Sequence, residues 1–165
     1  MARRKRYEPV ERTAKGYVVN LEQEEIDLLA RLFDELRGLL LNPDPQTAPL
    51  LRRLAPPAYH LADDAEAETE YQRLMHDDLV ATRLEAITTV EALLRAGRPF
   101  DEEGAQALLR SLNSVRLVLG TLLDVGERDD PAAIPDDHPM VGEMHLYHFL
   151  SYLLESTVQA ISGDI

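Results

Sequence analysis

Apolar residues recur three and four positions apart in several long segments, and this spacing predicts a protein built from amphipathic helices. The clearest case lies between residues 21 and 41, where one face collects Ile26, Leu29, Leu32, Phe33, Leu36, Leu39 and Leu40. Asn20 and Gln23 predict a capping box at the start of this helix, and Asn42-Pro43 predicts its end.

The middle of the chain carries a longer helical pattern that changes phase. Residues 63–95 form one run of helical spacing, and Gly97 is a stop signal after it. The apolar positions before and after residues 76–78 do not share one helical face. We therefore predict a kink or two separate helices there, with a new cap at Asp77.

Three more helices are predicted around this run. Residues 49–59 contain one short helix between prolines, and residues 102–124 form a long helix capped by Asp101. The last helix covers residues 141–161, and its predicted core face consists of Met144, Tyr147, Leu150, Leu154, Val158 and Ile161.

A β-prone segment precedes the helices. Residues 16–20 are predicted to pair with residues 6–10 in a hairpin, where Pro9 restricts the pairing to an edge strand. The expected fold class is all-α: a compact bundle of about five helices with a short N-terminal β-hairpin.

Charge divides the 165 residues into two parts. Residues 1–15 hold six basic and two acidic side chains, whereas the other 150 residues hold 11 basic and 28 acidic ones. We expect a basic N-terminal arm at 1–15 and a single helical domain at 16–165. An acidic body repels phosphate backbones, so it suits a basic protein partner better than nucleic acid.

Composition excludes several functions. The chain has no cysteine, which removes disulfides, thiolate metal sites, a cysteine nucleophile and a thiol switch within it. No apolar run reaches the roughly 18 residues of a membrane span, and no apolar stretch follows the basic start as in a secretory signal. There is no P-loop, Rossmann fingerprint or nucleophile elbow. We expect a cytoplasmic protein that is not an enzyme and has no cofactor.

In the helix predicted at residues 102–124, the stretch "LLRSLNSVRLVLGTLLDV" (residues 108–125) contains polar and small residues among its apolar ones. At ~100° per residue, the core face is formed by Leu108, Leu112, Val115, Leu119 and Leu122. Asn113, Gly120 and Leu117 lie on the outer side, with Arg116 between them and the core boundary. Two interpretations are open. In the first, Arg116 extends to solvent and Gly120 allows a neighbouring helix to pack closely. In the second, these residues form a narrow groove that docks a partner or a second copy of the chain.

Two further groups offer weaker candidates. His145 and His148 lie three residues apart, with His138 upstream, a spacing that can place imidazoles on one metal ion. Solvated or capping histidines explain the same residues, and we expect no metal. The arm side chains Arg3, Arg4, Lys5 and Arg6 suit nucleic acid or an acidic partner, or they keep a chain terminus soluble.

Several segments in order resemble one protein family. They are "LLRRLAPPAY" at 50–59, "EYQRLMHDDLVATRLEAI" at 70–87, the stretch at 107–125 and "LYHFLSYLLESTVQAI" at 146–161. They resemble the actinobacterial domain-of-unknown-function family associated with the actinomycete oxidative-stress regulator. The most specific part is the pattern formed by Leu112, Asn113, Arg116, Leu117, Leu119, Gly120 and Thr121.

The resemblance implies a cytoplasmic helical regulator linked to oxidative stress and sulfur metabolism. It implies an action on transcription through a sigma factor or RNA polymerase, with DNA contact through the basic arm. Some members of the family carry N-terminal cysteines suited to a redox switch, but this chain has Lys5, Arg6 and Pro9 in that region. Thiol sensing therefore does not carry over.

We thus predict a non-enzymatic regulatory protein that acts mainly by protein–protein contact. A helix-turn-helix DNA-binding regulator is the first alternative, although no candidate recognition helix is basic. A metal-dependent enzyme using His138, His145 and His148 is a remote one. No membrane partner is expected, and a homodimer through Leu117 and the groove is compatible with the pattern.

Overall fold

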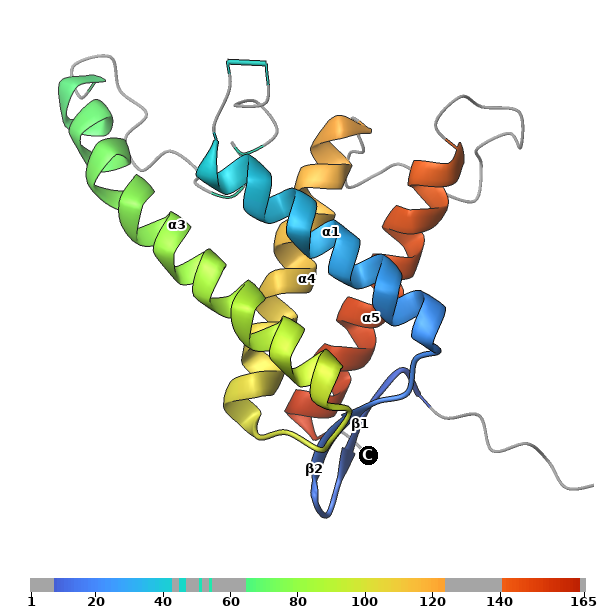
Figure 1. Ribbon diagram of the computed structural model, residues 1–165. Coiled ribbons are helices and arrows are strands. Elements are labelled where there is room, and N and C mark those ends of the chain that lie inside the picture. Colours follow the sequence, from blue (N-terminus) through green and yellow to red (C-terminus); the bar gives the residue numbers. More distant parts are fainter. Residues whose placement is uncertain are drawn as a thin grey trace, which may run out of the picture.

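The computed structural model describes residues 8–42, 45, 46, 51, 54, 65–123 and 141–163; for residues 65, 68 and 71–77 it describes the backbone alone. The described elements are β1 (Val10–Thr13), β2 (Gly16–Val19), α1 (Gln23–Leu41), α3 (Ala65–Ala96), α4 (Glu102–Leu122) and α5 (Val141–Ser162). The predicted class, helical with a short hairpin, is confirmed (Figure 1). The short helix predicted at 49–59 lies outside the described residues except for Leu51 and Leu54.

The hairpin pairs β1 and β2 antiparallel, with Val10 opposite Val19 and Thr13 opposite Gly16. The predicted hairpin is confirmed, but its first strand lies at 10–13 instead of 6–10. The chain turns at residues 14 and 15, and Gly16 supports this turn with a φ of +126°, which only glycine adopts readily. Residues 10–13 of the segment expected as an arm therefore belong to the fold.

The free edge of β2 is covered by the connection between α3 and α4. Tyr17 donates its backbone N–H to the Phe100 carbonyl at 2.8 Å, and Phe100 donates to the Tyr17 carbonyl at 2.9 Å. The two rings stack with their centroids 6.1 Å apart, and both residues are buried. This contact attaches the hairpin to the helical bundle.

The start of α1 differs from its prediction. The backbone N–H of Glu22 donates to Glu25 Oε1 at 3.1 Å, so the capping box uses these residues instead of Asn20 and Gln23. Asn20 is engaged by the hairpin, because its side-chain amide donates to the Glu8 carbonyl at 2.8 Å. The predicted end of the helix, at Asn42, is confirmed.

The helix α3 is a single uninterrupted helix of 32 residues, so the kink predicted at 76–78 is wrong. The first turns of α3 lie away from the other helices (Figure 1). Because these turns do not pack on the core, their apolar residues do not have to share a face with those of the second half, and the helix stays continuous. The buried positions Ile87 and Val90 lie in its second half. The helix ends as predicted, with Gly97 at a φ of +63°.

In the core, α4 packs against α5 and against the second half of α3, and α1 packs against α3 and α4 (Figure 1). The largest fully buried apolar side chains of the core are Phe33, Leu29, Ile87, Leu112, Leu150, Leu153 and Val90. The Asp101 cap of α4 is confirmed by its bond from the Gly104 N–H at 2.9 Å. Two predicted core positions are wrong, since Leu122 is 51% exposed and Val158 is 47% exposed.

Candidate functional site

The predicted groove on α4 lies partly against α5. The Arg116 guanidinium lies 5.8 Å from the centre of the Tyr147 ring, and its Nη1 donates to the Tyr147 hydroxyl at 3.5 Å. Asn113 and Leu117 are half-buried, and Gly120 is buried. These contacts favour the interpretation in which this face seats a neighbouring helix. Docking of a partner at the groove stays a prediction.

The core face of α4 is broader than its leucines indicate. Ser111 and Ser114, which the pattern left unassigned, are only 2% and 1% exposed. Ser114 satisfies its hydroxyl by donating to the Arg110 carbonyl at 2.8 Å, a bond within the helix. Its bond within the helix lets Ser114 be buried beside leucines at low cost, whereas the Ser111 Oγ is buried without a hydrogen-bond partner.

Arg83 on α3 is the polar residue that sequence reasoning missed. Its Nη1 donates to the Ser114 hydroxyl on α4, and its Nη2 donates to the Leu54 carbonyl at 3.2 Å. Its Nε is buried without a partner. Burial lowers the pKa of Arg83, and the nearby positive charge of Arg110 lowers it further. Among the described residues, the guanidinium therefore joins α3, α4 and Leu54 by hydrogen bonds to neutral acceptors.

The spacing of apolar residues in α3 indicates that Arg83 faces the core. It lies three residues after Val80 and four before Ile87, on the side of the helix that those residues turn to the core. An arginine at such a position either extends to solvent or finds a buried acceptor. The identity of the acceptors depends on α4 and on Leu54, which no local pattern reveals.

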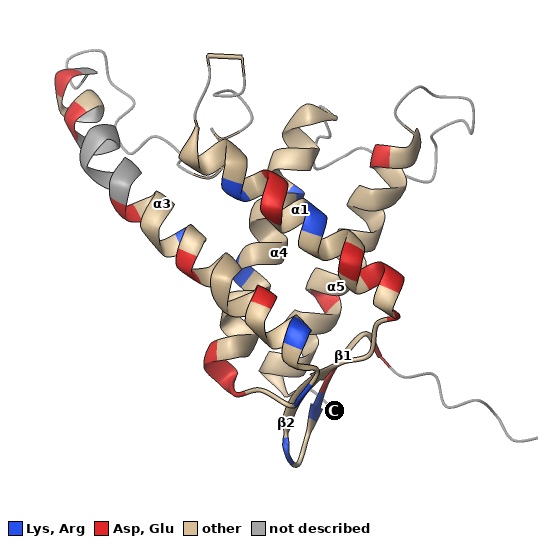
Figure 2. Ribbon diagram, viewed as in Figure 1, with Lys and Arg blue, Asp and Glu red and all other residues tan. Residues whose placement is uncertain are grey.

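The solvent side of α1 carries an excess of acid. Its exposed charged residues, with those of its cap, are Glu22, Glu24, Asp27, Asp34, Glu35 and a single base, Arg31. Arg37 is half-buried and pairs with Asp34 at 3.2 Å and with Glu91 of α3 at 2.7 Å. The hydrogen bond to Glu91 raises the pKa of Arg37. Figure 2 shows acidic positions grouped toward the end of α1 nearest the hairpin.

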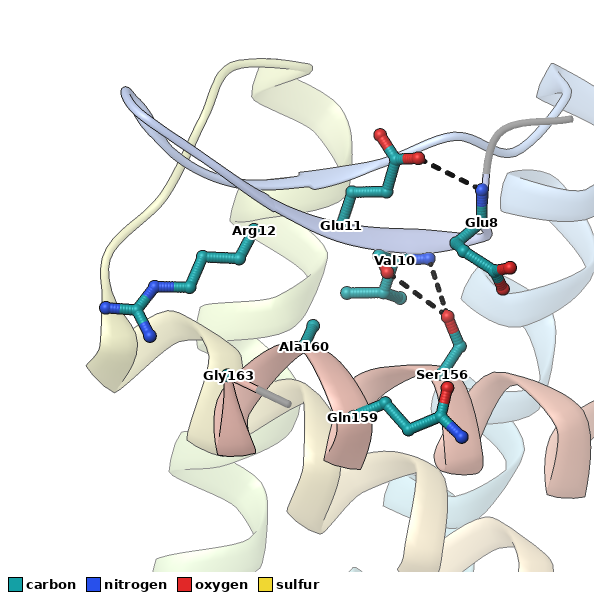
Figure 3. Close-up of a pocket in the computed structure, with 8 residues that line it drawn as sticks. All are labelled: Glu8, Val10, Glu11, Arg12, Ser156, Gln159, Ala160 and Gly163. Carbon is teal, nitrogen blue, oxygen red and sulfur yellow. Dashed lines mark hydrogen bonds between the residues drawn. The ribbon is translucent and has the colours of Figure 1, made fainter. Parts of the chain in front are cut away.

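An open pocket of about 610 Å³ lies between β1 and the end of α5 (Figure 3). At its base the Ser156 hydroxyl accepts from the Val10 N–H at 3.1 Å and donates to the Val10 carbonyl at 3.2 Å. Arg12 and Gln159 line the same pocket. Because Ser156 is fully used by the strand, it offers no nucleophile, and its evident role is to close the β1 edge at this residue.

The remaining candidates are only partly placed. His145 is exposed on α5 and His148 is half-buried, with its Nε2 lacking a hydrogen-bond partner; His138 lies outside the described residues. Within the ranges that the structure describes, no three His, Cys, Asp or Glu side chains are grouped as metal ligands require. The arm residues Arg3, Arg4, Lys5 and Arg6 also lie outside them. None of the described helices has the length and apolar character needed to cross a bilayer.

Comparison with known proteins gives one family and a small group of relatives. Residues 6–161 match the family described as Domain of unknown function (DUF2017). Curated proteins from Mycobacterium bovis and Mycobacterium tuberculosis, each called "Oxidative stress regulator AosR", are 28% identical to the chain over 130 residues. The alignment covers 70% of this chain but 59% of each relative, so the chain spans about three-fifths of their length. No solved structure matches the chain.

Proposed function

The chain belongs to the family described as Domain of unknown function (DUF2017), and we propose that it is a non-enzymatic regulatory protein acting by contact with another protein. The observation that carries the regulatory role is its similarity, over 70% of its residues, to proteins named as oxidative stress regulators. We expect it to work in the cytoplasm, on transcription under oxidative stress.

We place the protein contact on the solvent side of α1. Five exposed carboxylates of α1 and its cap face solvent there with one exposed arginine. One of the five, Asp34, pairs with the half-buried Arg37, which also pairs with Glu91, so four exposed carboxylates lie outside that pair. A surface of one sign attracts a partner of the opposite sign and accelerates the encounter. The partner is therefore a protein with a basic surface, such as a sigma factor or another component of the transcription machinery.

The signal must reach this protein by a route other than its own thiols. The chain has no cysteine, so an oxidant cannot form a disulfide or a sulfenic acid on it. We propose that the partner, or its abundance, carries the redox information. The basic residues Arg3, Arg4, Lys5 and Arg6 of the arm add a weak, salt-dependent attraction to DNA close to the partner.

The test compares transcripts in a strain that lacks the gene, before and after an oxidant. We expect the set of oxidant-responsive transcripts to change on deletion and to be restored by the wild-type gene. A variant with Glu24→Lys and Glu35→Lys, two exposed positions of α1, should restore it less well. An unchanged transcript profile in the deletion strain would overturn the regulatory role.

A matched control separates the position of the charges from their number. Asp78→Lys with Glu85→Lys makes the same change in net charge on exposed positions of α3. We expect the α3 variant to restore the response like the wild type. If both variants restore it fully, α1 is not the contact surface, although the regulatory role stands.

A further inference from the structure

The outer edge of β1, the edge that does not pair with β2, presents the backbone groups of alternate residues. In an antiparallel pair, two residues that lie opposite each other either exchange both backbone hydrogen bonds or direct both groups away from one another. The N–H and C=O of Tyr17 are both bonded to Phe100, on the side away from β1. Arg12 lies opposite Tyr17, so its own N–H and C=O point away from β2. They lie on the outer edge, as do those of Val10.

Only one of these two residues is closed by the rest of the fold. The Ser156 hydroxyl bonds both backbone groups of Val10, whereas no described residue bonds those of Arg12. Arg12 is exposed and lines the open pocket of about 610 Å³ between β1 and the end of α5 (Figure 3). A free N–H and C=O on an edge strand are the groups that an added strand bonds.

The side chain of Arg12 places a positive charge beside these free backbone groups. Its Cζ lies 6.0 Å from the centre of the Tyr17 ring. A Cβ at Gly163 would lie 3.2 Å from Arg12 Nη1, so the glycine leaves room for the guanidinium at the wall of the pocket. The ion pairs between described side chains both involve Arg37, so no described carboxylate neutralises Arg12. The guanidinium is therefore available to a carboxylate from outside the chain.

We propose that the outer edge of β1 at Arg12 binds an extended segment of a partner protein, with a glutamate or aspartate of that segment directly opposite Arg12. The acidic residue accepts from the Arg12 N–H and donates its own N–H to the Arg12 carbonyl. Residues paired in this way direct their side chains to the same side of the sheet, so the carboxylate meets the guanidinium. The backbone bonds require an extended peptide, and the charge of Arg12 selects an acidic residue in it.

The site accepts one pair of opposite residues. Ser156 closes the edge at Val10, and the chain turns at residues 14 and 15 on the other side of Arg12. A contact of this size is weak and transient. The inference is independent of the proposed function, because that function places a basic partner on the solvent side of α1, whereas this edge takes an acidic segment.

The test adds the capped peptide acetyl-Thr-Val-Glu-Val-Thr-amide, whose only carboxylate is the glutamate side chain, to the full chain. Hydrogen exchange of the Arg12 amide should slow by at least about fivefold at saturating peptide, because its N–H gains an acceptor. The Val10 amide is already bonded to Ser156 and should keep its exchange rate. A peptide with an N-methyl group on the glutamate nitrogen cannot donate to the Arg12 carbonyl and should not bind. Unchanged exchange of the Arg12 amide with the unmethylated peptide would overturn the proposal.

A charge exchange tests the acidic residue. The wild type should bind the peptide about two- to fivefold more tightly than its lysine analogue, and Arg12→Glu should reverse this preference. Lys15→Glu makes the same charge change at an exposed turn residue that does not line the pocket, and it should keep the wild-type preference.

Three results would overturn the proposal. Equal binding of the methylated and unmethylated peptides would exclude strand pairing, and loss of the preference in Lys15→Glu would show that the charge acts at a distance. Protection of the Arg12 amide in the protein alone would show that the chain itself, or a second copy, occupies the edge. Circular dichroism of each variant confirms that the comparison is made between folded proteins.

Discussion

Replacing Ser156 by alanine removes the side chain that joins β1 to α5. The hydroxyl accepts from the Val10 N–H and donates to the Val10 carbonyl, and Ser156 and Val10 are 4% and 3% exposed. A buried backbone group left without a partner costs about 1–3 kcal/mol. The open pocket at this edge lets water approach Val10, so we expect a total loss of ~2 kcal/mol in the free energy of unfolding. For a chain of this length the melting temperature should fall by about 4–8 °C.

Denaturant unfolding followed by circular dichroism measures the loss, and hydrogen exchange measures its location. The Val10 amide should exchange at least about tenfold faster in Ser156→Ala, since 1.4 kcal/mol corresponds to a factor of ten. The control is Thr88→Ala, which removes an exposed hydroxyl bonded within its own helix and should change stability by less than about 0.5 kcal/mol. Unchanged protection of the Val10 amide, with unchanged stability, would refute the role of Ser156.

Three other substitutions test close contacts and charge. Gly16→Ala should lower stability by more than about 2 kcal/mol, because the new Cβ would lie 2.6 Å from the Phe100 carbonyl at a positive φ; thermal melting measures it. Gly104→Ala should cost about 1–3 kcal/mol, because its Cβ would lie 2.9 Å from the Leu93 Cδ1 and 3.0 Å from a ring carbon of Phe100; a smaller loss in urea unfolding would show that these two side chains move aside. Arg110→Gln should raise stability by a few tenths of a kcal/mol at low salt, since it removes the positive charge that disfavours ionised Arg83; the gain should diminish in high salt, as measured by unfolding at two ionic strengths.

Local sequence signals predicted those parts of the fold that depend on neighbouring residues. The Asp101 cap and the end of α1 at Asn42 agree with the prediction, because each is determined within one turn of helix. Asn20 was assigned to the wrong role, since an amide that can cap a helix can equally bond a strand. The kink predicted in α3 was wrong because the change of apolar phase at residues 76–78 has a second explanation. A change of apolar phase bends a helix only if both halves pack on the same core.

The polar contacts between helices were beyond prediction. Arg83 lies at a core-facing spacing, yet its acceptors are a serine on α4 and the carbonyl of Leu54, both remote in sequence. Arg116 was identified from its position on α4, but its contact with Tyr147 depends on how α5 is rotated. Pair contacts of this kind follow from packing, which the pattern of a single helix does not determine.

The rotation of α5 shows why an apolar pattern can indicate a surface as well as a core. The predicted stripe through Leu154 and Val158 differs by about a quarter turn from the buried face, which includes Leu153 and Thr157. The Thr157 hydroxyl donates to the Leu153 carbonyl at 2.7 Å, and Ser156 is bonded to β1, so both polar side chains can be buried at low cost. Because these two polar side chains take buried positions of α5, Val158 of the predicted stripe faces solvent instead and is 47% exposed.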